Sequence, residues 1–197
     1  AKQLQLNVND KRTFVVGMAR QKGFTLIELM VAIALAALLL SMAVPALDSF
    51  TTNARQTSAI NDFVASMHLA RNTAVTTNAR VTVCASSDGV ACEAVPWNQG
   101  WIVFSDQNSN QLIDGTDAIV TSSGEVEGLA VQSGEFGLAM QYRPNGRVTN
   151  AGANGNSGQF TVCDDRGANY AKVVIVDLSG RPRLSKTMAD GSAPDCV

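Results

Sequence analysis

The sequence has little of what an enzyme active site or a zinc site needs. It has one histidine, His68, and no cysteine, aspartate or glutamate accompanies it at metal-ligand spacing. It also has no glycine-rich phosphate loop, no Gly-x-Ser-x-Gly sequence and no Cys-x-x-Cys pair. These absences argue against an enzyme, a cofactor and a zinc site, and they favour a structural or interaction role.

Basic residues are absent between Arg80 and Arg143, and this absence divides the C-terminal half into two electrically different parts. The first part carries eight acids: Asp88, Glu93, Asp106, Asp114, Asp117, Glu125, Glu127 and Glu135. The second carries seven basic residues against Asp164, Asp165 and Asp177: Arg143, Arg147, Arg166, Lys172, Arg181, Arg183 and Lys186. The asymmetry predicts two distinct surfaces, one of which could attract phosphates.

One long apolar run occupies residues 24–47, and Glu28 is its only charge. The run exceeds 20 residues, which is enough to cross a bilayer core of about 30 Å. Arg20 and Lys22 directly before it predict a cytoplasmic N-terminus, and no small-residue cleavage site follows it. We therefore expect one transmembrane helix over 24–47 that stays attached to the chain.

Helical periodicity continues past this run and predicts an amphipathic stem over 48–78. Apolar residues recur at spacings of three, four and seven: Phe50, Ala54, Ile60, Phe63, Val64, Met67, Ala70 and Ala74. This stripe should pack on a globular domain, while Gln56 and Arg71 belong to the opposite, polar face. Pro45 should kink the long helix because proline removes a backbone donor and clashes with the preceding turn.

From Arg80 onward the hydrophobic period changes to two, which predicts β-strands. The expected strands cover 81–84, 101–104, 118–121, 129–131, 136–142, 159–163 and 172–178, and the glycine-rich segment 150–158 should be a loop. The predicted fold class is therefore α+β. A long N-terminal helix, first transmembrane and then amphipathic, packs on an antiparallel β domain over 79–197.

Four cysteines, at positions 84, 92, 163 and 196, allow three disulfide pairings. The membrane topology places the β domain outside the cytoplasm, where disulfides persist. We favour Cys84–Cys92, which closes a short loop, and Cys163–Cys196, which fixes the C-terminal tail, while the other pairings remain open.

The residues Gly23-Phe24-Thr25-Leu26-Ile27-Glu28 resemble the processing site of type IV pilins and pseudopilins. The resemblance implies that a prepilin peptidase cleaves between Gly23 and Phe24 and methylates the new amine of Phe24. Glu28 would then pair with the N-terminal amine of a neighbouring subunit. The alternative is that Glu28 lies shallow enough to reach headgroups and water. Pro45 also resembles the family, in which a proline bends or locally melts the stem.

The segment before Phe24 resembles a leader only in part. Residues 18–23 are short and basic, as family leaders are, whereas residues 1–17 look like an upstream extension, from a misassigned start or from an artificial addition to the chain. Residues 1–23 hold five of the 15 basic and one of the 17 acidic residues, so their removal leaves a net charge of −6. Bulk charge therefore gives no support for nucleic-acid binding.

Three segments of the β domain resemble the FimT/GspH group of minor pilins and pseudopilins: Cys84 to Cys92, Trp97 to Asp106 and Phe160 to Gly167. With the stem and the ending Ser179 to Arg183, the resemblance covers nearly all of the chain after the leader and favours the FimT-like branch. It implies a minor pilin of the initiating or tip complex of a type IV pilus, which assembles with other minor and major pilins. The protein would be single-pass in the bacterial inner membrane with a periplasmic β domain, and in the pilus after assembly. The alternative is a minor pseudopilin of a type II secretion system.

Arg181 and Arg183 alternate across Pro182, so that both side chains leave one face of an extended strand, with Lys186 nearby. Residues 180–183 resemble a Gly-Arg-x-Arg element that is associated with DNA binding in FimT-like proteins of naturally competent bacteria. About three phosphate contacts would give weak, salt-sensitive and sequence-independent binding to double-stranded DNA. Alternatively, these arginines pair with Asp164, Asp165 or a neighbouring subunit.

Oxygen-bearing side chains also recur over residues 106–117 at spacings typical of a calcium loop: Asp106, Asn108, Asn110, Asp114 and Asp117. However, Gln111 stands where such loops need glycine, and Asp117 stands where they usually carry glutamate. A hairpin turn rich in Asn and Asp explains the composition equally well, and we assign no metal site.

Overall fold

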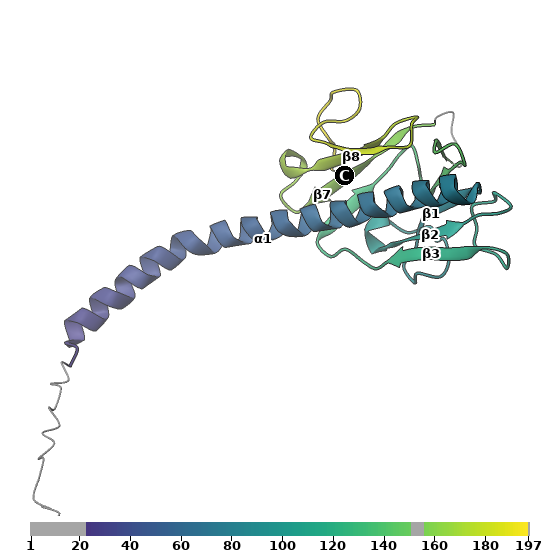
Figure 1. The fold of residues 1–197 in the computed structure, drawn as a ribbon. Helices are drawn as coiled ribbons and strands as arrows, with labels where there is room; N and C mark the ends of the chain where they lie inside the picture. Colours follow the sequence, from purple (N-terminus) through teal and green to yellow (C-terminus); the bar gives the residue numbers. More distant parts are fainter. Residues whose placement is uncertain (1–22, 151–155, 197) are drawn as a thin grey trace, which may run out of the picture. The chain divides into compact units, whose positions relative to one another are not determined.

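The protein is described here by a computed structural model over residues 23–150 and 156–196 (Figure 1). Our expectations for the leader and its extension fall on residues 1–22, apart from Gly23, and lie outside the described residues. The chain divides into two compact units, Ala1–Leu47 and Asp48–Val197, and helix α1 (Leu26–Thr77) contributes residues to both.

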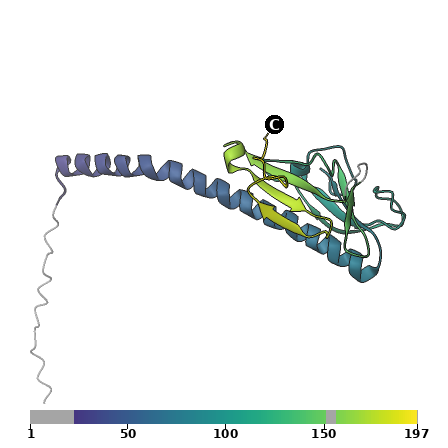
Figure 2. The same ribbon diagram turned by 90° about the horizontal axis from the view of Figure 1, so that it is seen from above.

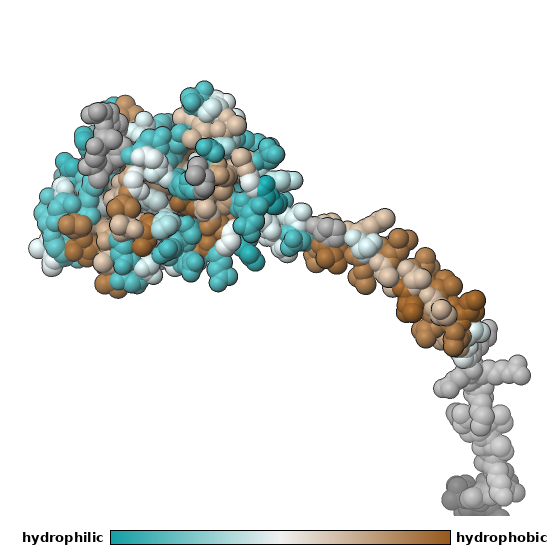
Figure 3. All heavy atoms as spheres, turned by 180° about the vertical axis from the view of Figure 1, so that it is seen from behind, coloured by the Kyte–Doolittle hydropathy of each residue, from teal (hydrophilic) through white to brown (hydrophobic). Residues whose placement is uncertain are grey.

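The described part of the first unit is an apolar helical segment. Within the described residues, α1 is the one helix long and apolar enough to cross a membrane, with a mean hydropathy of 2.5 over its most apolar stretch. The large side chains of this segment, such as Ile27, Leu35 and Leu39, are exposed. Figure 3 shows the surface of this segment as predominantly apolar. A surface of this kind is stable in lipid and costly in water, as expected of the predicted transmembrane helix.

The second unit combines the C-terminal part of α1 with two antiparallel sheets (Figures 1 and 2). The first sheet has the order β3-β2-β1-β5-β6, formed by β1 (Val81–Ala85), β2 (Trp101–Ser105), β3 (Ala118–Ser123), β5 (Ala139–Tyr142) and β6 (Val148–Asn150). The second has the order β4-β7-β8-β9, formed by β4 (Leu129–Gln132), β7 (Gly158–Asp164), β8 (Lys172–Val176) and β9 (Pro182–Ser185). Two short 3-10 helices, η1 (Trp97–Gln99) and η2 (Ala168–Tyr170), complete the unit. The predicted α+β class is confirmed.

One face of α1 forms the core of this unit together with the inner faces of both sheets. Ile60, Phe63, Met67, Ala70 and Ala74 are buried in one cluster with residues of both sheets. The ring centroid of Phe63 lies 4.9 Å from that of Trp101 in the first sheet and 4.8 Å from that of Phe160 in the second. A single helix side chain therefore joins the two sheets.

The predicted apolar stripe is wrong at its beginning. Phe50 is 68% exposed and Ala54 is also exposed, whereas Gln56, which we placed on the polar face, is buried. The Gln56 amide donates hydrogen bonds to the carbonyl oxygens of Val162 at 3.4 Å and Tyr170 at 3.1 Å. Hydrogen bonding offsets the cost of burying this amide, so a polar residue can occupy a position that periodicity alone reserves for an apolar one.

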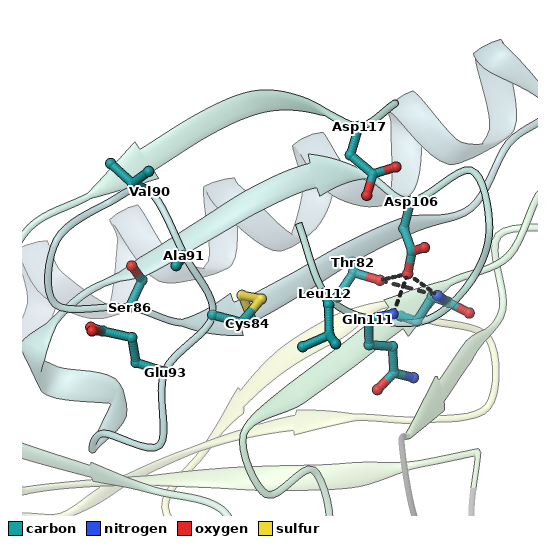
Figure 4. Close-up of a disulfide and its surroundings, with 12 residues drawn as sticks. Thr82, Cys84, Ser86, Val90, Ala91, Glu93, Asp106, Gln111, Leu112 and Asp117 are labelled. Atoms are coloured by element: carbon teal, nitrogen blue, oxygen red, sulfur yellow. Dashed lines mark hydrogen bonds between the residues drawn. A yellow bond between two sulfur atoms is a disulfide. The ribbon is translucent and has the colours of Figure 1, made fainter. Parts of the chain in front are cut away.

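The outer faces of the two sheets are covered by loops that the disulfides hold. Cys84 is joined to Cys92, which closes the segment after β1 over the outer face of the first sheet (Figure 4). Cys163 is joined to Cys196, so that the C-terminal tail crosses the outer face of the second sheet. Along that face, the N–H of Ala189 donates to Gln159 Oε1 at 2.8 Å. These are the two pairings that we favoured from the sequence.

Candidate assembly site and nucleic-acid interface

The predicted processing position lies immediately before the first turn of α1. Gly23 and Phe24 precede the helix, and Phe24 is 83% exposed. Thr25 Oγ1 accepts the backbone N–H of Glu28 at 3.3 Å, and the Thr25 carbonyl accepts the N–H of Leu29 at 3.1 Å. A threonine followed three residues later by glutamate is typical of a capping box, so Thr25 sets the start of the helix. An amine on Phe24 would therefore stand just outside the helix and remain accessible.

Glu28 lies in the first turn of α1 and is exposed. Within the described residues no other side chain forms an ion pair with it, while the helix N-terminus favours a carboxylate at this position. Pro45 lies within α1, close to the boundary between the two compact units. The kink that we predict there, and the pairing of Glu28 with a neighbouring subunit, stay predictions.

A tight turn positions the two arginines of the predicted DNA site. The N–H of Gly180 donates to the Asp177 carbonyl at 2.9 Å, and Gly180 has a φ of 71°. A Cβ on Gly180 would lie 2.2 Å from the carbonyl oxygen of Gly146, so this position requires glycine. Arg181 and the edge strand β9 follow at once, with Arg183 opposite Ile175 of β8.

The same turn lies against the hairpin between β5 and β6, which the sequence alone does not indicate. Arg71 Nε of α1 donates to the carbonyl oxygens of Gly146 at 3.1 Å and Ser179 at 3.4 Å, and so joins the two turns. Arg147 follows Gly146 and is exposed. The fold therefore brings the β5–β6 hairpin, with Arg147, to the same region as Arg181. A helix residue that we placed on the polar face holds the two turns together.

The side chains of Arg181, Arg183 and Lys186 are exposed. Over residues 23–150 and 156–196, none of these three side chains makes a hydrogen bond or an ion pair within 4 Å. The alternative in which Asp164 pairs with these arginines is wrong. Asp164 Oδ2 instead lies 2.6 Å from Arg166 Nη2, and Arg166 also lies over the ring of Tyr170.

One carboxylate borders the arginines without neutralising them. Asp177 accepts hydrogen bonds from Ser179 Oγ at 2.5 Å and from the Ser179 N–H at 2.9 Å. These bonds, followed by the backbone N–H of Arg181 and the charge of Arg183, hold the pKa of Asp177 below its usual value. Asp177 therefore acts mainly as the carboxylate that orders the turn, and the guanidinium groups stay available.

The acidic loop over residues 106–117 is organised around a buried aspartate. Asp106 Oδ2 accepts hydrogen bonds from Thr82 Oγ1 at 2.8 Å, Gln141 Nε2 at 2.6 Å and the Gln111 N–H at 3.0 Å (Figure 4). Gln111 adopts a positive φ of 61°. Within the described residues, no group of three or more His, Cys, Asp or Glu side chains has the arrangement of a metal site. The hydrogen bonds to Asp106 explain the conformation of the loop as that of a structural turn, which is one of the two interpretations that its Asn- and Asp-rich sequence allowed.

An apolar helix with a capped, accessible start, joined to a disulfide-linked β domain, defines the protein as a membrane-anchored subunit of the type IV pilin class. The profile of the type II transport protein GspH matches residues 59–180, and the prokaryotic N-terminal methylation motif matches residues 18–44. The chain therefore belongs to the GspH family of minor pilins and pseudopilins, whose members are structural subunits. The methylation motif implies processing by a prepilin peptidase and assembly with other pilins.

Solved structures with a similar fold include the type IV minor pilin FimU of Pseudomonas aeruginosa. One crystal form is 18% identical with a TM-score of 0.54 and covers 74% of this chain and 96% of that chain. A second form gives 18% identity and a TM-score of 0.51, with 70% and 96% covered. The minor pseudopilin EpsH of the Vibrio cholerae type 2 secretion system is 13% identical with a TM-score of 0.46, covering 66% and 96%. No curated protein matches the sequence significantly.

Proposed function

We propose that the protein is a minor pilin of a type IV pilus, which joins the initiating or tip complex and binds double-stranded DNA through β9. Cleavage between Gly23 and Phe24 frees an amine that pairs with Glu28 of a neighbouring subunit. Before assembly the protein resides in the inner membrane with its β domain in the periplasm, and it enters the pilus on assembly.

The observation that carries this proposal is the exposed arginine pair at the start of the edge strand β9, with Arg181 directly before the strand and Arg183 within it. The guanidinium groups of Arg181 and Arg183 form no hydrogen bond or close ion pair among the described residues, although Asp177 lies near enough to feel the charge of Arg183, and Arg147 and Lys186 add positive charge around them. Guanidinium groups suit phosphate oxygens, and a flat strand edge can follow a DNA backbone.

A second candidate, a minor pseudopilin of a type II secretion system, is favoured by the family profile, which carries the name of a type II transport protein. Deletion of the gene separates the two. Loss of pili, twitching or transformation supports the pilus function. Exoproteins retained in the periplasm, with normal pili, support the secretion function. Normal pili with failed DNA uptake would indicate a dedicated DNA receptor.

DNA binding is tested by titrating the detergent-solubilised chain with double-stranded DNA at several salt concentrations. Three phosphate contacts predict a slope of log K against log salt of about −2.7, because each contact contributes about −0.9. The variant Arg181→Ala/Arg183→Ala should reduce the slope by about 2. The matched control Lys172→Ala removes one charge from β8 and should change the slope little. Equal binding by the double variant and the parent would show that Arg181 and Arg183 do not form the DNA-binding site.

A further inference from the structure

The strand β3 ends the five-stranded sheet and is exposed along most of its length. It has the sequence Ala-Ile-Val-Thr-Ser-Ser, with no charged residue and no proline. Ile119 is 45% exposed and Val120 is 37% exposed. The register with β2 shifts between Val103 and Phe104, so that Val120 has no partner residue on β2. Figure 1 shows β3 at the rim of the β domain, with no strand beyond it.

Such an edge is unusual because proteins normally protect the outer strands of a sheet. Unpaired backbone groups of an edge strand can bind another chain, and charged residues or proline on the edge prevent this. The edge β9 of the other sheet has this protection, since it contains Pro182 and Arg183. At the opposite edge of that sheet, β4 is in contact with η1, and the N–H of Val126, just before β4, donates to the Asn98 carbonyl of η1 at 2.8 Å. The edge β3 has β-branched residues, and it contains neither proline nor a charged residue that would prevent pairing.

The surroundings of β3 are acidic at both ends. Asp114 and Asp117 precede the strand, and Glu125 and Glu127 follow it. Arg55 of α1 lines the same hollow as Glu125 and Glu127, but with Asp62 these two acids keep the net charge there negative. Asp88 lies in the disulfide-closed loop, where Gly89 packs close to Ser122 of β3. Hydrogen bonds hold the pKa of Asp88 and of Asp114 below their usual values, mainly from the Val90 N–H and the Asn108 amide respectively. Both groups therefore carry a full negative charge at neutral pH.

We propose that β3 is a docking edge that binds an extended, basic segment of another protein chain as an additional strand of the first sheet. The backbone of the incoming strand would pair with the open edge of β3, as in other strand-addition complexes. Its apolar residues would cover Ile119 and Val120, and its basic residues would face the carboxylates at both ends. This surface is separate from β9, so the proposal does not depend on DNA binding or on the choice between pilus and secretion.

The charge around β3 decides which kind of partner fits. An acidic or neutral strand could form the same backbone hydrogen bonds, but only a basic one gains from the surrounding carboxylates. These carboxylates are exposed, so their contribution should be modest and should decrease with salt. We therefore expect the site to bind basic segments more tightly than acidic ones at low salt.

The test uses the detergent-solubilised full chain and a labelled peptide of the length of β3 that alternates lysine and valine. A peptide with glutamate in place of each lysine is the matched probe. We expect saturable binding of the basic peptide at low salt, at least tenfold tighter than that of the acidic one. Hydrogen exchange should show that the basic peptide slows exchange of the amides of residues 118–123.

Two variants locate the binding. Ile119→Lys/Val120→Lys should weaken binding of the basic peptide at least tenfold, whereas Leu184→Lys, at an exposed apolar position on the β9 edge, should leave it unchanged. Glu125→Gln/Glu127→Gln should weaken it about threefold. An unchanged unfolding midpoint shows that each variant is folded. Equal binding of both peptides, unprotected amides over 118–123, or full binding by Ile119→Lys/Val120→Lys would overturn the proposal. So would amides over 118–123 that are already protected by self-association of the chain before any peptide is added.

Discussion

Single residues fix the geometry on which the candidate sites depend, and most of them are polar groups in structural roles. Thr25 caps α1 and leaves Phe24 outside it, Gly180 allows the turn before β9, and Arg71 joins that turn to the β5–β6 hairpin. The residue types at positions 23–28 could be predicted because they form a contiguous motif. The role of Arg71 could not, because its partners are carbonyl groups 75 and 108 positions away, and carbonyls leave no sequence signal.

Replacing Gly180 with alanine should destabilise the β domain by about 3 kcal/mol, because alanine is strained at positive φ and its Cβ would meet the Gly146 carbonyl. Urea unfolding measures the loss. Gly115→Ala is the control, since a Cβ there meets no atom within 4 Å, and it should cost less than about 0.5 kcal/mol. Equal midpoints for the two variants would show that the turn relaxes freely.

The pair of Asp164 and Arg166 should make stability depend on pH. Hydrogen bonds from Arg166 hold the pKa of Asp164 below its ordinary value of 3.8, so the ionised carboxylate is favoured in the folded state. The stabilisation is therefore complete above about pH 4 and is lost as the pH falls through the lower, folded-state pKa. Arg166→Met should lower the free energy of unfolding at neutral pH, and this difference should shrink on acidification. A difference that stays constant from neutral to strongly acidic pH would contradict this pairing.

At the scale of elements, the strands show where pattern reading succeeds and where it fails. Buried strands such as β1, β2, β7 and β8 lie within a residue or two of their predicted ranges, because their apolar runs are bounded by turn residues. The predicted strand over 136–142 begins only at Ala139, since Gly137 has a φ of 55° and turns the chain. The strand β6 was not predicted, and β9 was expected only as an extended segment around Pro182, because both are short edge strands without an apolar pattern.

The packing of α1 on both sheets should depend strongly on one aromatic ring. Phe63 is 3% exposed and contacts Trp97, Trp101 and Phe160, so Phe63→Ala should cost about 3–5 kcal/mol. Unfolding of the solubilised chain, followed by tryptophan fluorescence, measures this cost. Phe50→Ala is the matched control, because Phe50 is 68% exposed and should change stability by less than about 0.5 kcal/mol. A small loss for Phe63→Ala would mean that the sheets hold together without the helix.

At the scale of the whole molecule, the protein combines a membrane-length helix with a separate β domain that presents two contrasting edges. The sequence indicates this division through its change of hydrophobic period and its uneven charge. It does not indicate that the basic residues lie at β9, the edge of one sheet, while the acids lie around β3, the edge of the other. Strand order depends on pairing between distant segments, which the sequence does not reveal. One chain can therefore be held by its helix and still offer two different surfaces to partners.

The most direct test of the proposed function is mass spectrometry of pili sheared from cells that produce the protein. The pilus function predicts a peptide that begins at Phe24, carries a methyl group on its amine and occurs in a small amount relative to the major subunit. It also predicts that Glu28→Leu is processed in the same way but is missing from the sheared pili. Pili that lack the protein, in cells whose deletion mutant retains exoproteins in the periplasm, would contradict the pilus function and assign the chain to secretion.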